Sequence, residues 1–294
     1  MERKNIVDPN YPYTYRRTLC AIKRLVCRYR GLLRIGETGS SEQGRNIPLL
    51  ILGTGKRKLF LLGSIHGREY VTTGYLLRCA EEYAHSAQCP KGYGGFDLQK
   101  LLLEYSFYIL PLCNPDSVEI ALGRALPEHR DEAFCAYTYK NNGRNVNLNA
   151  NFPFEWQAVP KERQGGDFAA SERETRFIMS LCEKHSFEAA LSFHTRGGCV
   201  FWRDSVNGLV PYDREMAESI SRGCNLKLCP ETKEKKDCAG GFENWFRYRY
   251  NRPSLCVELV SDETAPFDLA CREFERYTDW ERTRLVPLVS AKAL

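Results

Sequence analysis

Apolar runs alternate with amphipathic segments along the chain, and this order predicts strands that alternate with helices. Residues 14–33 place apolar side chains at helical spacing between basic residues, which predicts an opening helix. Apolar runs bounded by turn residues predict strands near residue 33 and within 47–52, 58–65, 105–118, 187–195 and 253–262. Helical patterns occupy residues 71–87, 171–185, 213–226, 240–250 and 268–291. Together they predict an α/β fold, a mixed and mostly parallel twisted sheet with helices on both faces.

The domain organisation is predicted to be simple. No internal repeat, low-complexity segment or Ser/Pro-rich linker divides the sequence, so residues 1–294 form one expected domain, with residues 1–14 as an N-terminal extension. A chain of 294 residues with 43% apolar content can bury a substantial core. Ser171 and Glu174 have the spacing of a capping box, which predicts the start of one helix.

Charge and cysteine content exclude several function classes. The net charge of +5 is spread along the chain, which argues against a nucleic-acid partner. The sequence has no apolar stretch of about 18 residues, so it predicts no membrane span. The first charged residues are not followed by an apolar segment, as they would be in a secretory signal. The thirteen cysteines are odd in number and irregularly spaced, so reduced thiols and a cytoplasmic location are expected. The oligomeric state stays open.

The spacing His-x-x-Glu occurs three times and therefore carries little weight by itself. His129 and Glu132 lie in the polar segment LPEHRDE, which predicts a solvated loop or turn. His185 and Glu188 straddle a predicted helix end, where a histidine near the last carbonyls needs no metal. In GSIHGREY, by contrast, the histidine follows a buried strand and precedes a glycine. The carboxyl edge of a strand is where open α/β sheets place their sites.

A second apolar strand, FEAALSFHT, also ends in a histidine, His194. His66, Glu69 and His194 would complete the two-histidine, one-glutamate set that holds a catalytic zinc and leaves one position for water. The strand PSLCVELVSD carries one acidic residue, Glu258, between valine and leucine. Burying a carboxylate there is costly unless it is paired or functional, so Glu258 is the candidate base.

These residues resemble the zinc metallocarboxypeptidase family, and within it most closely the bacterial γ-D-glutamyl-meso-diaminopimelate peptidases. The matching blocks are GSIHGREY, LPLCNPDSVE, YKNNGRNVNLNANFPFEW, SFHTRGGCVFW, AGGFENWF and CVELVSD. The resemblance implies a zinc-peptidase catalytic domain with one Zn²⁺ per chain. It assigns His66, Glu69 and His194 as zinc ligands.

The resemblance also implies the remaining roles. Glu258 matches the general base, and Lys140 falls where the family has a cation that stabilises the oxyanion, with Arg144 as the alternative. Asn149 matches the asparagine that binds the substrate carboxylate. Glu243 matches a position in the pocket for the side chain after the cut. Arg196 is predicted from its own place in the sequence instead: it follows His194 by two residues, in a loop that is expected to face the metal, where it would hold a carboxylate. An arginine and a glutamate together suit a zwitterionic side chain such as that of meso-diaminopimelate.

The sequence departs from the family at three places. Ala150 stands where C-terminal trimming enzymes have an arginine that grips the terminal carboxylate, which weakens a plain carboxypeptidase interpretation. Asn147 replaces an aspartate that orients a zinc histidine in many relatives. The family's mobile tyrosine is missing from residues 236–238.

The expected function is zinc-dependent hydrolysis of an amide bond in small peptides, specifically the γ-D-glutamyl-diaminopimelate bonds of peptidoglycan fragments. One alternative is a metallocarboxypeptidase or deacylase that acts on other small amides. A second alternative is a catalytically impaired protein that binds wall peptides, which the three departures favour. The expected partners are thus peptide substrates, with no nucleic acid and no membrane.

Overall fold

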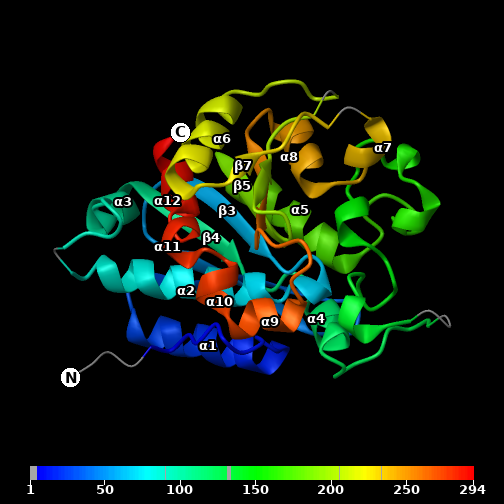
Figure 1. The fold of residues 1–294 in the computed structure, drawn as a ribbon, viewed down its shortest axis with the longest axis horizontal. Helices are drawn as coiled ribbons and strands as arrows, with labels where there is room; N and C mark the ends of the chain where they lie inside the picture. Colours follow the sequence, from blue (N-terminus) through cyan, green and yellow to red (C-terminus); the bar gives the residue numbers. More distant parts are fainter. Residues whose placement is uncertain (1–4, 90, 131–133, 205, 233) are drawn as a thin grey trace.

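The computed structural model describes residues 5–89, 91–130, 134–204, 206–232 and 234–294 (Figure 1). Within these residues the strands form one eight-stranded sheet in the order β1-β2-β4-β3-β5-β8-β6-β7. The central strands β4, β3, β5 and β8 are parallel, whereas β1, β2 and β6 pair antiparallel with their neighbours β2, β4 and β8. The strands are β1 (Leu33–Ser40), β2 (Asn46–Leu52), β3 (Arg57–Gly63), β4 (Tyr105–Leu110), β5 (Ala189–Thr195), β6 (Cys199–Phe201), β7 (Lys227–Leu228) and β8 (Ser254–Leu259).

Helices lie between the strands and after the last one. They are α1 (Tyr15–Arg28), α2 (Val71–Ser86), α3 (Leu98–Glu104), α4 (Pro115–Ala121), α5 (Arg173–His185), α6 (Asp213–Cys224), α7 (Lys235–Cys238), α8 (Phe242–Tyr250), α9 (Phe267–Arg272), α10 (Phe274–Tyr277), α11 (Trp280–Thr283) and α12 (Val286–Lys292). Short 3-10 turns include η1 (Gly67–Glu69), η3 (Leu148–Ala150) and η5 (Lys161–Arg163).

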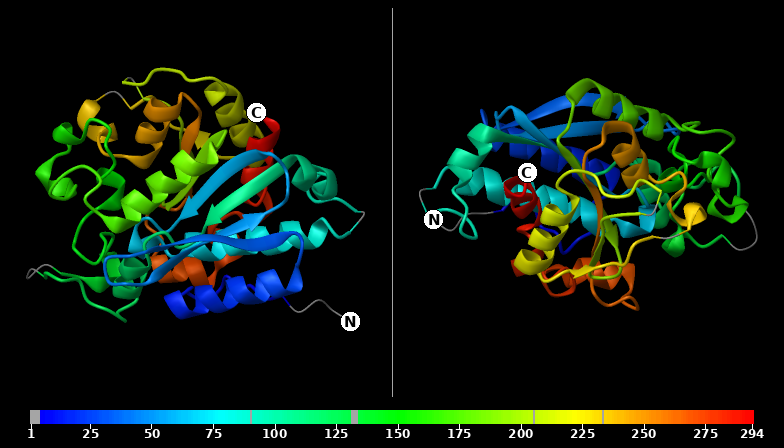
Figure 2. Two further views of the ribbon diagram at one scale, coloured as in Figure 1. Left: turned by 180° about the vertical axis from the view of Figure 1, so that it is seen from behind. Right: turned by 90° about the horizontal axis from the view of Figure 1, so that it is seen from above.

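The sheet is covered on both faces, and strand β3 shows why. Successive side chains of a strand point to opposite faces, so its continuous apolar run supplies both cores. Leu59 and Leu61 pack in one cluster with α1, α2, α6 and α12. Phe60 and Leu62 pack in the other cluster with α5 and α8. The two helical layers are visible on either side of the sheet (Figures 1 and 2), which confirms the predicted α/β fold with helices on both faces.

Two local predictions were wrong. The helix predicted over residues 268–291 is divided into α9 to α12, and the break between α10 and α11 falls at Asp279, which adopts a left-handed φ of 47°. Ser171 and Glu174 form no capping box. Helix α5 begins at Arg173, and the Glu174 carboxylate turns inward to accept the backbone N–H of Glu42 at 3.1 Å.

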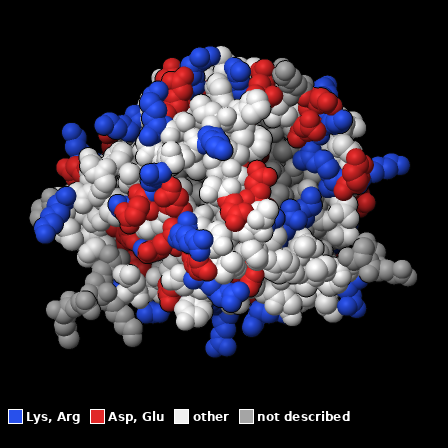
Figure 3. Space-filling view, in the orientation of Figure 1, with Lys and Arg blue, Asp and Glu red and all other residues white. Residues whose placement is uncertain are grey.

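No helix among the described residues combines the length and apolar character that crossing a bilayer requires. Basic and acidic side chains are intermixed over the face shown in Figure 3. This mixture agrees with the spread of charge along the sequence.

Candidate active site

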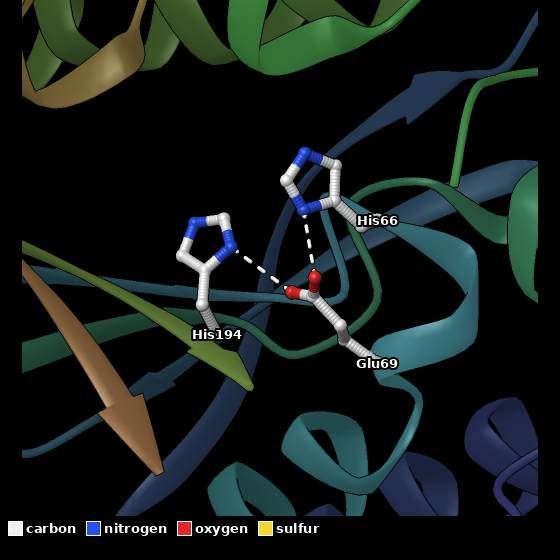
Figure 4. A group of neighbouring side chains, drawn as sticks. All are labelled: His66, Glu69 and His194. Atoms are coloured by element: carbon white, nitrogen blue, oxygen red, sulfur yellow. Dashed lines mark hydrogen bonds and ion pairs between the residues drawn. The ribbon is translucent and has the colours of Figure 1, made fainter. Parts of the chain in front are cut away.

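Three predicted metal ligands converge at the carboxyl ends of neighbouring strands. His66 follows β3, Glu69 ends the turn η1, and His194 lies in β5, the strand beside β3. The Glu69 carboxylate sits between the two imidazoles, with Oε1 at 2.9 Å from His66 Nδ1 and Oε2 at 3.0 Å from His194 Nδ1 (Figure 4). Both histidines therefore direct the same nitrogen, Nδ1, toward the Glu69 carboxylate.

The loop that carries His66 is held by close packing on helix α4. A Cβ atom at Gly67 would lie 2.2 Å from the Ser117 carbonyl oxygen, so only glycine permits this approach. Asn114, from the Asn-Pro-Asp segment, donates from Nδ2 to the Ile65 carbonyl at 2.9 Å and also caps α4. The segment thus fixes the backbone immediately before His66.

The electrostatics of the three ligands suit a cation. Glu69 is buried, yet the two histidines hold its pKa well below the usual range despite that burial. Burial lowers the pKa of His66, and its neighbours His194 and Lys140 act in the same direction. One nitrogen from each histidine and one Glu69 oxygen lie within 4.8 Å of one another. This donor set matches that of catalytic zinc sites, so the residues present fit one zinc ion.

The outer nitrogens of the two histidines meet different partners. His66 Nε2 lies 3.2 Å from Asn147 Oδ1, a neutral acceptor. His194 Nε2 lies 3.8 Å from Glu243 Oε1, and the same carboxylate oxygen accepts the hydroxyl of Ser192. The outer nitrogen of His66 therefore meets an amide where many relatives have a carboxylate, whereas the outer nitrogen of His194 faces the carboxylate of Glu243.

Glu258 lies in strand β8, at the same carboxyl-terminal edge of the sheet as the three predicted metal ligands. It is the direct partner of His194 in the parallel β5·β8 pairing, so both side chains lie at one level of the sheet. Its Oε2 is buried and has no hydrogen-bond partner among the described residues. Burial, together with Glu69 and Glu243, raises the pKa of Glu258 to about 8, although His194 opposes this shift. A carboxylate that holds a proton this tightly is suited to general acid–base chemistry.

An open cavity of about 700 Å³ adjoins these residues. His66, His194 and Glu258 form part of its wall, as does the predicted substrate residue Asn149. Its other charged lining residues carry both signs: Arg163, Arg203, Arg247, Asp204, Glu231, Glu234, Asp237 and Glu243. The space is large enough for a small peptide, and its walls offer partners to ammonium and carboxylate groups alike.

The two candidates for the oxyanion role lie in different places. Lys140 has a pKa lowered by burial and by the nearby Arg68 and Arg163, and Glu69 acts on it in the opposite direction. Its charge influences the pKa of His66, but Lys140 lines a second, smaller cavity with Tyr139 and Asn141 and is not part of the wall beside His66 and His194. Arg144 instead binds the buried Glu172 at 3.2 Å and approaches Asp167 at 3.4 Å. Neither cation lines the cavity, but the charge of Arg144 is already paired with these two acids, so Arg144 is the weaker of the two candidates.

The predicted substrate residues are only partly brought together. Asn149 and Glu243 both line the cavity. Arg196 does not: its guanidinium donates to the Ala265 carbonyl and lies 4.6 Å from the centre of the Phe267 ring. The prediction that Arg196 faces the cavity is wrong, because the segment at the start of α9 provides an acceptor, the Ala265 carbonyl, and an aromatic face, the Phe267 ring.

Two cations near the site were not predicted. Arg68 lies within the turn between His66 and Glu69, and its place between two ligands could have indicated a role. Arg163 lines the cavity beside Asn149. It belongs to η5, a short turn in the long connection before α5, where no periodic pattern marks a functional residue.

The other His-x-x-Glu pairs have protein partners where they are described. His185 Nε2 lies 3.1 Å from Glu37, and Glu188 pairs with Arg57 at 2.8 Å. For the third pair, Glu132 lies outside the described residues.

A zinc ion held by three protein ligands keeps one position free for water, and here that position would adjoin an open cavity. The class of protein is therefore a metallohydrolase built on an α/β sheet. Residues 19–282 match the zinc carboxypeptidase family, so the chain belongs to that family and is a zinc metallopeptidase.

The chain is similar to two bacterial relatives. It is 25% identical over 275 residues to gamma-D-glutamyl-L-diamino acid endopeptidase 1 of Lysinibacillus sphaericus, covering 87% of this chain and 67% of the relative. It is 28% identical over 253 residues to an uncharacterized protein of Bacillus subtilis, covering 76% of this chain and 64% of that protein. The chain thus spans about two thirds of the length of either relative.

Among solved structures, the fold resembles that of carboxypeptidase A from Helicoverpa armigera. The TM-score is 0.75 at 17% sequence identity, and the match covers 99% of this chain and 76% of the other. This likeness confirms the carboxypeptidase fold.

Proposed function

We propose that this metallopeptidase cleaves the amide bond between a γ-D-glutamyl residue and a diamino acid, diaminopimelate or lysine, in peptidoglycan fragments. The observation that carries the proposal is the cavity beside His66 and His194, whose wall combines arginines with a larger number of carboxylates. A diamino acid brings an ammonium and a carboxylate into that space. The similarity to a relative named for γ-D-glutamyl-L-diamino acid cleavage supports the same substrate class.

The chain's own residues account for the steps of such a hydrolysis. His66, Glu69 and His194 would hold the zinc, which when bound polarises the scissile carbonyl and lowers the pKa of a water molecule. Glu258 takes the proton from the attacking water and delivers it to the leaving amine. Lys140 stabilises the negative charge that develops on the carbonyl oxygen.

A cytoplasmic site of action forms part of the proposal. All thirteen cysteines are free thiols in the structure. A reducing compartment such as the cytoplasm keeps so many cysteines in the thiol form. The substrates would then be wall fragments that have entered the cell.

The test compares two substrates. The zinc-loaded protein is incubated with L-alanyl-γ-D-glutamyl-meso-diaminopimelate and with a dipeptide that has a hydrophobic C-terminal residue, and the products are separated by chromatography. Preferred release of diaminopimelate is expected. Preferred cleavage of the hydrophobic dipeptide would instead favour a general carboxypeptidase.

A Glu258→Gln variant is the matched control for the chemistry. It is expected to keep its zinc and to lose about 10²- to 10⁴-fold in kcat, because it can no longer transfer the proton. Equal turnover by both proteins, insensitive to a chelator, would contradict hydrolysis at this site and leave a peptide-binding role.

A further inference from the structure

Arg163 lies in the cavity wall with its positive charge unneutralised by the protein. Its Nη1 donates to the carbonyls of Lys236, Asp237 and Ala239 at 2.9, 3.3 and 3.2 Å, and its Nη2 donates to the Asn149 carbonyl at 2.9 Å. These acceptors are all neutral backbone groups. Among the described residues, no carboxylate lies within ion-pair distance of its guanidinium.

Holding a half-buried cation in this way is unfavourable without an anion nearby. Burial lowers the pKa of Arg163, and Asp237 and Glu243 offset this only in part from longer range. Arg247, which lines the same cavity, shows the contrast, since it pairs with Asp213 at 2.5 Å. The counter-charge that Arg163 lacks in the protein can come from a ligand in the cavity.

The donors that remain on Arg163 point to a carboxylate. A guanidinium has five N–H groups, and the contacts above leave Nε–H and one Nη2–H without a protein acceptor among the described residues. Asn149 lies beside it, and its Oδ1 already accepts the backbone N–H of Phe242 at 2.8 Å. That contact leaves the Asn149 amide N–H groups for a ligand. Two kinds of donor therefore meet at one place in the wall.

Position 150 does not provide this charge. Ala150 is fully buried, and a Cβ atom at Gly240 would lie only 2.3 Å from the Ala150 carbonyl oxygen, so the backbone there is tightly packed. Arg163 comes from a separate turn and reaches the same stretch through the Asn149 carbonyl. It also anchors the backbone of residues 236–239, the segment in which the family's tyrosine is missing.

We infer that Arg163 and the Asn149 amide bind the carboxylate of the substrate residue that leaves with the amine. The inference rests on the proposed peptidase function, because it assigns one group of the same substrate. Arg163 is a specificity residue: it requires that the residue after the cleaved bond carry a free carboxylate. An arginine supplied from η5 performs the task for which the family uses the residue after Asn149.

The experiment is a substrate-by-variant cycle. Wild-type protein and Arg163→Gln are assayed on L-alanyl-γ-D-glutamyl-L-lysine and on the same peptide with a C-terminal carboxamide. For wild type, amidation is expected to lower kcat/KM by about 10- to 100-fold, the effect of losing one charged hydrogen-bonded pair. Arg163→Gln is expected to lose a similar factor on the acid and little more on the amide.

Lys161→Gln removes an exposed cation from the same turn and is expected to leave both rates unchanged. Arg163→Lys, which keeps the charge, is expected to recover part of the preference for the acid and serves if the glutamine variant does not fold. Equal losses on acid and amide in Arg163→Gln would show that the arginine only anchors the backbone, and would overturn the inference.

Failure of the proposed function has a different signature. If wild-type protein cleaves neither peptide, that substrate class is wrong, and calorimetric titration of zinc-loaded protein with L-lysine and L-lysinamide tests the inference directly. Tighter binding of L-lysine that disappears in Arg163→Gln supports a carboxylate site. The absence of any preference between the two probes in wild type refutes it.

Discussion

Replacing Glu243 by glutamine is expected to weaken zinc binding, although Glu243 is not one of the three ligands. Its Oε1 lies 3.8 Å from His194 Nε2, both side chains are buried, and the hydroxyl of Ser192 holds the carboxylate in place. The pKa of Glu243 is lowered, because His194 and Ser192 outweigh its burial. The carboxylate is therefore charged and faces the outer nitrogen of a ligand whose Nδ1 is directed to the metal site.

The size of the effect follows from this distance. Two full charges at 3.8 Å in a medium of effective dielectric constant ~20 interact by ~4 kcal/mol, which is an upper limit because a zinc-bound imidazole carries only part of a charge. Loss of a carboxylate behind a metal-bound histidine typically costs about 10- to 100-fold in metal affinity. Because His194 Nε2 has no hydrogen-bond partner among the described residues and 3.8 Å is an ion-pair distance, a weakening of zinc binding at the lower end of that range, about 10-fold, is expected for Glu243→Gln.

The assay is competition for zinc with a chromophoric chelator, followed by the absorption spectrum of the cobalt-substituted protein. Glu234→Gln is the matched control, because Glu234 also lines the cavity but pairs with Lys236 rather than with a histidine. In the opposite direction, Asn147→Asp adds a carboxylate 3.2 Å from His66 Nε2 and is expected to tighten zinc binding. Equal zinc affinities in wild type, Glu243→Gln and Glu234→Gln would refute the reasoning.

Further predictions concern the cations and a buried acid. Lys140→Met should lower kcat by about 10²- to 10³-fold in steady-state assays if it stabilises the oxyanion. Arg144→Met should leave kcat near wild type but destabilise the fold by about 1 kcal/mol in urea titrations, because Glu172 loses a partner. Burial raises the pKa of Glu174 to about 8, so its contribution to stability is full below pH 4.5 and is lost as pH rises through 8. Wild-type protein should lose up to ~5 kcal/mol of its free energy of unfolding between pH 5 and pH 8.5, and Glu174→Gln should lose less. Urea titrations of both proteins at the two pH values measure this, and an equal loss in both would contradict the prediction.

The strands that carry the site could be predicted because each of them is a run of consecutive apolar residues. The runs ending at His66 and His194 are apolar throughout, as parallel strands buried on both faces must be. The strands β6 and β7 were missed because they comprise three and two residues and owe their conformation to pairing with β8 and with each other. Local pattern has no means of indicating such short elements.

Side-chain direction in loops was the less predictable part of the site. Arg196 follows His194 by two residues, and nearness in sequence predicted nearness to the cavity. The structure turns its guanidinium to the Ala265 carbonyl instead. The direction of a loop side chain depends on acceptors supplied by distant segments, and Ala265 lies 69 residues away. Capping at Glu174 failed for the same reason, since its partner is the backbone of Glu42.

Both departures from the family at Asn147 and Ala150 remove a charge, and in both cases a like charge stands close by in space. Glu243 provides a carboxylate to the other zinc histidine, and Arg163 provides a cation beside Asn149. Neither residue is near its counterpart in sequence, because helix α8 and the turn η5 meet the strand ends only in the folded chain. A metal centre and a carboxylate site depend on which charges converge, rather than on which position in a motif carries them. The missing motif residues therefore argue for a rearranged peptidase site, and the paired variants at 147 and 243 measure how far the rearrangement compensates.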